Sequence, residues 1–133
     1  MNFLRVLVID DSEIDRYILT RHLKKAGIVN VEQCANALDA INYLHRQCEE
    51  QDIEPPDLII LDINMPKMNG FEFLESTQEM FTSGYLSKCK VLMYSAADQP
   101  AEKLKIQKLP MVEQFLPKGS TPEQVQSLLT ALF

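Results

Sequence analysis

The chain has 133 residues, of which 46% are hydrophobic and 24% are charged. This length suits one domain with its own core, and we expect residues 1–133 to form a single domain with no output domain attached. No apolar run approaches the roughly 20 residues of a membrane-spanning helix, and the N-terminus lacks a signal-peptide pattern. These observations exclude a membrane protein and favour a cytoplasmic location.

Charge and cysteine content narrow the expected partners. The formal net charge is −6, and the basic residues are scattered, so no nucleic-acid-binding surface is indicated. The cysteines Cys34, Cys48 and Cys89 are odd in number and form no C-x-x-C pair, which argues against a disulfide framework or a zinc site. We expect free thiols, and a partner that is a protein, a cation, or a phosphate held through a cation.

Short apolar runs alternate with stretches that have helical patterns, in the order typical of an α/β protein with a doubly wound parallel sheet. A continuous run such as LIIL is typical of a strand covered by helices on both faces, although so short a run could also be a buried helical turn. The five expected strands span residues 3–9, 31–35, 58–61, 91–94 and 114–116.

The first helix is expected over residues 13–26. Ser12 followed by Asp15 resembles a capping box with a shorter acid, and Gly27 stands where the helix needs a left-handed stop. Asn36 can cap a second helix, and a third should begin near Gly70. The apolar positions expected to face the core are Ala37, Ile41, Leu44 and Cys48 in the second helix, and Phe71 and Leu74 in the third.

The last two helices differ in the strength of their signals. Residues 99–109 have a poor apolar stripe made of Leu104, Ile106 and Leu109. In the final helix, Thr121 is the expected N-cap, Pro122 takes the first position and Gln124 completes a capping box. Its apolar stripe consists of Val125, Leu128, Leu129 and Leu132.

Polar residues follow four of the expected strands. Ligands of an open parallel sheet bind outside the carboxyl ends of the strands, where the strand order changes direction. A strand order of 2-1-3-4-5 would place the first and third strands side by side at this point. The residues concerned are Asp10 and Asp11 after the first strand, Asp62 after the third, Ser95 after the fourth and Lys118 after the fifth.

Three carboxylates in one crevice repel one another unless a cation compensates their charge. Oxygen ligands with open positions suit Mg²⁺, whereas zinc favours histidine or cysteine. Lys118 offers a mobile positive charge and Ser95 a hydroxyl donor, both matched to phosphoryl oxygens. We therefore expect a phosphoryl-transfer site in which Asp62 is the nucleophile, since a carboxylate can form an acyl phosphate.

At this point the chain resembles a known family. The Asp10-Asp11 pair, LDINMPKMNG at 61–70, YSA at 94–96 and FLPKG at 115–119 occur in this order. Each motif alone is weak, but together they resemble the receiver domain of two-component response regulators, over essentially the whole chain. The resemblance implies a flavodoxin-like (βα)5 fold and a stand-alone phosphorelay protein that is not an enzyme in the usual sense.

The resemblance also implies a role for each site residue. Asp62 corresponds to the aspartate that takes a phosphoryl group from the phosphohistidine of a sensor histidine kinase or a histidine phosphotransfer protein. Asp11 and Asp62 correspond to direct Mg²⁺ ligands, Asp10 to one acting largely through water, and the backbone carbonyl of Asn64 to a further ligand. Ser95, Lys118 and the aromatic Phe115 match the phosphoryl-binding and switch residues, although Phe115 could equally be a core residue.

The family's output is a shift of the surface formed by the fourth helix, fifth strand and fifth helix, which changes binding to a downstream protein. A homodimer through this surface is possible on the same resemblance. One position departs from the pattern, because the family usually has proline after the lysine, joined by a cis peptide, and this chain has Gly119. We expect either a trans bond with a changed loop or a strained cis bond.

Two other functions are compatible with parts of the pattern. A haloacid dehalogenase-type phosphatase also uses an aspartate nucleophile with Mg²⁺, but it needs a second aspartate two residues on, where this chain has Asn64. A receiver-like interaction module that works without phosphorylation is the other alternative.

Asn69-Gly70 is most simply a turn, with Gly70 expected at positive φ.

Overall fold

A computed structural model describes residues 1–50, 52–96 and 100–133. One parallel five-stranded sheet with the order β2-β1-β3-β4-β5 forms its centre, which confirms the predicted fold class and strand order. The strands are β1 (Arg5–Ile9), β2 (Asn30–Cys34), β3 (Leu58–Asp62), β4 (Lys90–Ser95) and β5 (Val112–Pro117).

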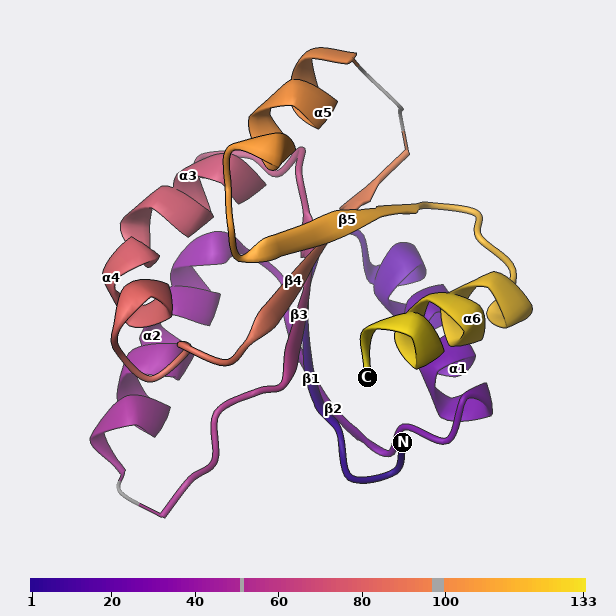
Figure 1. Cartoon of the computed structure of the whole chain (residues 1–133), viewed down its shortest axis with the longest axis horizontal. Coiled ribbons are helices and arrows are strands. Elements are labelled where there is room, and N and C mark those ends of the chain that lie inside the picture. The colour runs from indigo at the N-terminus through magenta and orange to yellow at the C-terminus, as the bar shows by residue number, and fades with distance from the viewer. Residues whose placement is uncertain (51, 97–99) are drawn as a thin grey trace.

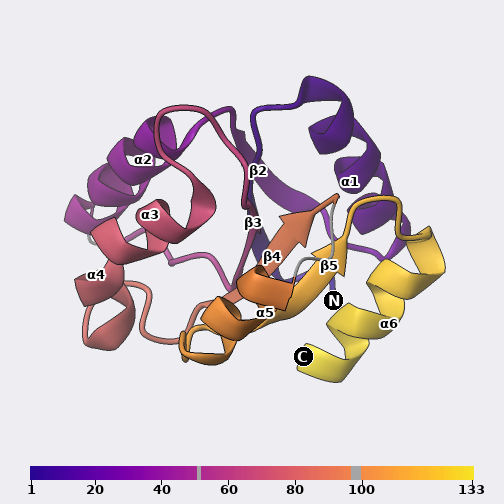
Figure 2. The same cartoon turned by 90° about the horizontal axis from the view of Figure 1, so that it is seen from above.

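Helices cover both faces of the sheet (Figures 1 and 2). On one face lie α1 (Glu13–Lys25) and α6 (Pro122–Leu132), and on the other lie α2 (Ala37–Glu49), α3 (Gly70–Ser76), α4 (Gln78–Thr82) and α5 (Pro100–Gln107). None of these helices has the length and apolar character needed to cross a bilayer, within the described parts of the chain.

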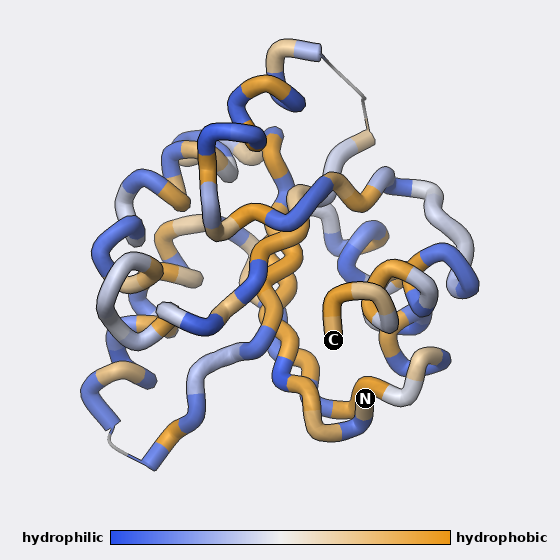
Figure 3. The backbone as a smooth tube through the Cα atoms, viewed as in Figure 1, coloured by the Kyte–Doolittle hydropathy of each residue, from blue (hydrophilic) through white to orange (hydrophobic). Residues whose placement is uncertain are grey.

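The sheet separates two apolar cores. Alternate side chains of each strand point to opposite faces, so Val8 and Ile60 pack toward α1 and α6, whereas Ile9 and Leu61 pack toward the opposite helices. Every residue of β3 is buried, because helices cover both of its faces. Figure 3 shows the apolar colour concentrated along these central strands, in agreement with the continuous LIIL run.

Strands β1, β2 and β5 begin or end at other residues than the sequence predicts. β1 begins at Arg5, two residues later than predicted, and β2 begins and ends one residue earlier than the predicted 31–35. β5 runs over Val112–Pro117 and is longer than the predicted 114–116. Its Glu113 is exposed, since β5 lies at the edge of the sheet, and this polar residue hid the start of the strand.

The third helical region is two helices in place of the single predicted one. The break is at Thr77, which is buried and whose hydroxyl donates a hydrogen bond of 2.8 Å to the carbonyl oxygen of Phe73. A threonine side chain that binds the carbonyl four residues earlier satisfies its hydroxyl within the helix and bends it. Leu74 is buried as predicted, but Phe73, which the prediction omitted, is fully buried and Phe71 only partly.

Most helix ends are confirmed by their capping contacts. Ser12 accepts a hydrogen bond from the amide of Asp15, and Gly27 has a φ of +89°. Thr121 and Gln124 form the predicted capping box. Two apolar assignments are wrong, because Cys48 and Leu104 are exposed on α2 and α5. The start of the predicted helix at residue 99 lies outside the described residues.

Candidate functional site

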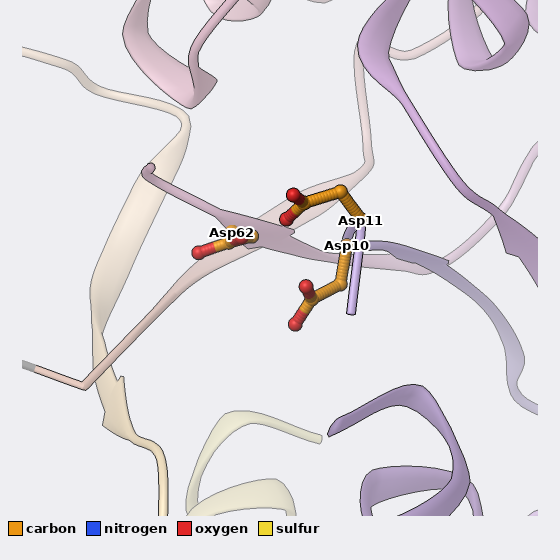
Figure 4. Close-up of side chains that lie close together, drawn as sticks. All are labelled: Asp10, Asp11 and Asp62. Atoms are coloured by element: carbon orange, nitrogen blue, oxygen red, sulfur yellow. The ribbon is translucent and has the colours of Figure 1, made fainter. Parts of the chain in front are cut away.

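The predicted carboxylates meet at the carboxyl end of the sheet (Figure 4). β1 and β3 are neighbours, with Ile9 beside Leu61, so Asp10 and Asp11 emerge next to Asp62. One carboxylate oxygen from each of the three residues lies within 4.8 Å of the others. Asp10 and Asp62 are buried, whereas Asp11 is exposed. The pocket therefore has a buried acidic floor and one acid at its open side.

Asp10 is held in place from two directions. Its Oδ1 accepts a hydrogen bond of 2.9 Å from the amide of Ser12, and its backbone oxygen accepts one of 2.6 Å from the guanidinium of Arg16. Arg16 also donates to the side chain of Gln33 at 3.3 Å, which ties α1 to β2. The first turn of α1 thus fixes the acid that lies beside the end of β1.

Lys118 lies in the same pocket. Its ammonium nitrogen is 2.9 Å from Oδ2 of Asp15, 3.0 Å from Oδ2 of Asp10 and 3.5 Å from Oδ1 of Asp62. It also lies 5.2 Å from the centre of the Tyr94 ring, within cation–π distance. Burial by itself would lower the pKa of Lys118. The hydrogen bonds with Asp15 and Asp10 and the charge of Asp62 outweigh this effect, so the pKa is raised above its ordinary value and the ammonium stays charged.

The peptide between Lys118 and Gly119 is trans, and Gly119 has a φ of +90°. Of the two peptide geometries expected from the sequence, the structure therefore has the trans bond. Residues other than glycine rarely adopt this left-handed conformation, which gives a local reason for glycine at this position. The Lys118 amide donates a hydrogen bond of 2.8 Å to the carbonyl oxygen of Ser95 and so joins the loop to β4.

Asp62 has an unusual environment for a carboxylate. Burial, followed by the charge of Asp10, raises its pKa from 3.8 to about 7, and this rise is opposed by the charge of Lys118 and the amide of Asn64. The Asn64 amide donates a hydrogen bond of 3.3 Å to Oδ1 of Asp62. A cation bound by the three acids would oppose this rise in the pKa, because it would favour the ionised carboxylate.

Ser95 and Phe115 take the positions expected from the strands. Ser95 is the last residue of β4 and is buried. Its carbonyl oxygen accepts the hydrogen bond from the Lys118 amide. Phe115 lies in β5, opposite Met93, and is half-buried against the core on the α2–α5 side. Asn64 follows β3 and is exposed. Asp10, Asp62, Ser95 and Lys118 thus lie at or directly after the carboxyl end of a strand, whereas Phe115 lies two residues before the end of β5.

Gly70 does not have the predicted positive φ, which in the described residues occurs at Gly27, Gly119 and Lys67. Its glycine identity has a steric cause. A Cβ at this position would lie 2.5 Å from the backbone oxygen of Asp62 and 3.1 Å from Cα of Ile63. Asn69 is also more than a turn residue, because it forms a capping box with Glu72 at the start of α3.

Three site residues were missed by the sequence analysis. Asp15 was interpreted as a helix-capping acid, yet its carboxylate pairs with Lys118, which is 103 positions away. Arg16 and Tyr94 have no local pattern that indicates a role in the site. Burial raises the pKa of the Tyr94 phenol to about 12, with a further contribution from Asp15, so the ring under Lys118 is neutral.

Comparison with known families agrees with this geometry. The family model described as the response regulator receiver domain matches residues 6–130. The chain belongs to the response regulator receiver family. As a receiver it is a signalling domain of two-component systems, in which receivers work with histidine kinases.

Among curated proteins, the receiver is 33% identical to protein PilH of Pseudomonas aeruginosa over 100 residues, which are 75% of this chain and 74% of that protein. It is 36% identical to the histidine kinase CKI1 of Arabidopsis thaliana over 104 residues, 74% of this chain. The chain spans only 9% of that kinase and 20% of an Archaeoglobus fulgidus protein-glutamate methylesterase to which it is also similar.

Solved structures show the same similarity across the whole fold. The receiver domain of CKI1 from Arabidopsis thaliana complexed with Mg²⁺ has a TM-score of 0.82 and 28% identity, covering 99% of this receiver and 95% of that chain. Chemotaxis protein CheY4 of Vibrio cholerae has a TM-score of 0.76 and 28% identity, with 98% of each chain covered. The acidic cluster of Asp10, Asp11 and Asp62 therefore resembles the Mg²⁺ site of receivers.

Proposed function

We propose that this receiver accepts a phosphoryl group on Asp62 from the phosphohistidine of a sensor histidine kinase or a histidine phosphotransfer protein. The observation that carries the proposal is the pocket itself. Asp10, Asp11 and Asp62 lie together, and the Lys118 ammonium is 3.5 Å from the Asp62 carboxylate. A nucleophilic carboxylate beside a cation site and a lysine is the minimal set for phosphoryl transfer to an aspartate.

The donor set fits Mg²⁺. Carboxylates of Asp10, Asp11 and Asp62, together with the backbone oxygen of Asn64, offer only oxygen, which is what this hard cation prefers. The exposure of Asp11 leaves an open side for water and phosphate. Bound at these residues, Mg²⁺ would offset the negative charges of the carboxylates and of the incoming phosphoryl group.

The chain's own residues then have separate tasks in the transfer. An oxygen of deprotonated Asp62 attacks phosphorus, the bond from phosphorus to the donor histidine nitrogen breaks, and the electron pair stays with the histidine. Lys118 pairs with the phosphoryl oxygens, and the hydroxyl of Ser95 donates a hydrogen bond to one of them. The backbones of these two residues are joined directly, because the Lys118 amide donates a hydrogen bond to the Ser95 carbonyl oxygen.

The output surface proposed for this receiver consists of α5, β5 and α6, which correspond to the predicted fourth helix, fifth strand and fifth helix. Phe115 and Lys118 both lie on or beside β5, so a movement of Ser95 and Lys118 toward the phosphoryl group would reach this surface. A downstream protein that recognises the shifted surface, or a second copy of the receiver, is the proposed reader.

The test is chemical modification of the receiver by a small phospho-donor such as acetyl phosphate. We expect one phosphoryl group, stable in acid and labile in base, added to Asp62 when Mg²⁺ is present. Omitting Mg²⁺ or introducing Asp62→Asn should abolish the modification, whereas Asp39→Asn, an exposed acid in the first turn of α2, should leave it unchanged. Absence of modification under conditions that phosphorylate another receiver would contradict the proposal and favour a phosphorylation-independent module.

A protein phospho-donor must cover the rim of this pocket. Directly after Asp11, α1 exposes three large apolar side chains on one face, namely Ile14 (71% exposed), Tyr17 (60%) and Ile18 (39%). Exposed apolar side chains beside a reactive site are suited to binding the donor. We therefore expect Ile14→Ala to slow phosphoryl transfer from the cognate histidine protein by about tenfold, as for a contact at the centre of an interface.

Two donors separate docking from chemistry in this experiment. Ile14→Ala should react with acetyl phosphate at the wild-type rate, because Ile14 is an exposed apolar side chain that supplies no charge or hydrogen bond to the pocket. Leu104→Ala, which removes a 61% exposed side chain on α5, is the matched control and should behave as wild type with both donors. Equal slowing by Ile14→Ala with the small donor would mean that the side chain supports the fold.

A further inference from the structure

Asp15 has a contact that its place on the helix does not explain. Its backbone amide serves the N-cap by donating to the Ser12 hydroxyl at 3.2 Å. Its carboxylate accepts a hydrogen bond of 2.9 Å from the ammonium of Lys118, which follows β5. The capping contact uses the backbone amide and would be retained by any residue except proline, so the carboxylate has a different role.

The distances from the Lys118 ammonium to Asp15, Asp62 and the Tyr94 ring indicate what the Asp15 carboxylate does. The ammonium is 2.9 Å from Asp15 but 3.5 Å from Asp62, so it lies closer to the acid on the rim than to the expected nucleophile. The Tyr94 ring, 5.2 Å from the same nitrogen, provides an additional favourable contact for the charge. A phosphoryl group bonded to Asp62 extends beyond the carboxylate oxygen, so an ammonium held at this distance leaves space for it.

The buried acids attract Lys118 strongly. Asp10 and Asp62 are almost completely buried, where charges are poorly screened, whereas the Asp15 side chain is 31% exposed. The ammonium is already 3.0 Å from Oδ2 of Asp10. Without the carboxylate of Asp15, it would be drawn closer to Asp62 as well. It would then occupy the oxygen atoms that a cation and a phosphoryl group must reach.

We propose that Asp15 is a positioning residue that holds the Lys118 ammonium back from Asp62, so that the Asp62 carboxylate stays free for Mg²⁺ and for the phosphoryl group. The inference rests on the proposed function and names a residue that this function requires in addition to the three pocket acids. It predicts that removing the Asp15 carboxylate harms the site through Lys118 and through no other group.

A double-mutant cycle of Asp15→Asn and Lys118→Met tests the proposal. Three quantities are measured: the Mg²⁺ dissociation constant, the rate of modification by acetyl phosphate, and the unfolding equilibrium constant of the metal-free protein in urea. In the wild-type background, Asp15→Asn should weaken Mg²⁺ binding and slow modification by about two- to fivefold, and raise the unfolding constant by a similar factor, the range for a partly exposed ion pair. In the Lys118→Met background all three effects should disappear.

Glu13→Gln is the matched control. It removes one negative charge from the same first turn of α1 without a contact to Lys118 in the described structure, and it should change none of the three quantities. A loss of Mg²⁺ affinity that is equal in Glu13→Gln, or that persists in the Lys118→Met background, would overturn the proposal, because the effect would then be a general one of charge or of the helix dipole.

The cycle also separates this proposal from the proposed function. If wild type is not modified by acetyl phosphate but Asp15 and Lys118 remain coupled in Mg²⁺ affinity and unfolding, the phosphorylation function fails and the contact is a restraint on Lys118 alone. If wild type is modified and the two residues are not coupled, Asp15 has no positioning role.

Discussion

Metal-free protein is expected to lose stability as the pH rises from about 4 to about 7, and Asp62→Asn is expected to remove most of this loss. Burial and the neighbouring Asp10 raise the Asp62 pKa from 3.8 to about 7, so the folded state binds a proton more tightly than the unfolded chain. Between these values folding favours the protonated form, and stability therefore falls as the pH increases. Below pH 4 both states are protonated and the group contributes nothing to the difference.

The size of this effect follows from the two pKa values. A carboxyl group whose pKa changes from 3.8 to about 7 accounts for at most about 4 kcal/mol of unfolding free energy. Water at the open side of the pocket screens part of the interaction, so we expect a loss of about 2 kcal/mol. Added Mg²⁺ should reverse the loss in wild type, because a cation stabilises the ionised carboxylate.

Urea unfolding in the presence of a chelator, at several pH values between 4 and 8, measures the effect directly. Glu75→Gln, on the exposed side of α3, serves as the control and should follow the wild-type pH curve. Curves for wild type and Asp62→Asn that stay parallel over this range would show that the Asp62 carboxyl keeps an ordinary pKa in the folded protein.

Gly70→Ala is expected to destabilise the protein by about 3 kcal/mol, the upper part of the range for forced overpacking. A Cβ at Gly70 would lie 2.5 Å from the backbone oxygen of Asp62 and 3.1 Å from Cα of Ile63, and neither atom belongs to a flexible side chain. Relief of the clash requires a shift of the segment that follows β3. Since this segment directly follows Asp62, the variant should also be phosphorylated more slowly.

Gly27→Ala separates steric overlap from the loss of backbone freedom. Gly27 has a φ of +89° and open space around a Cβ, so alanine there should cost only about 1 kcal/mol, from the left-handed conformation. Urea unfolding of both variants compares the two costs, and acetyl phosphate reports on the site. A Gly70→Ala protein as stable as Gly27→Ala would mean that the segment after β3 adjusts easily.

The sequence was sufficient for the order of elements and for most of the site because these features depend on local patterns. The LIIL run predicts a strand covered on both faces, and β3 is buried at every residue. Thr121 and Gln124 predict a helix start that the structure confirms by its capping box. Once the strands are parallel, their carboxyl ends must lie at one edge of the sheet, so Asp10 and Asp62 are brought together by topology alone.

Where local signals misled, contacts that the apolar pattern does not encode were responsible. Thr77 interrupts the predicted third helix because its buried hydroxyl binds the Phe73 carbonyl, and nothing in the local apolar pattern indicates that burial. Gly70 was assigned to a positive φ, the common reason for glycine in a turn, but the actual reason is the close approach of the Asp62 backbone.

The sequence by itself determined the receiver fold, the three acids and the lysine, because each of these follows from strand patterns and from residues at strand ends. Only the tertiary structure decided how the lysine is held. Asp15 and Lys118 are 103 positions apart and meet because α1 and the loop after β5 border the same pocket. An ion pair across that distance leaves no periodic or local trace in the chain, since it depends on packing of the whole domain.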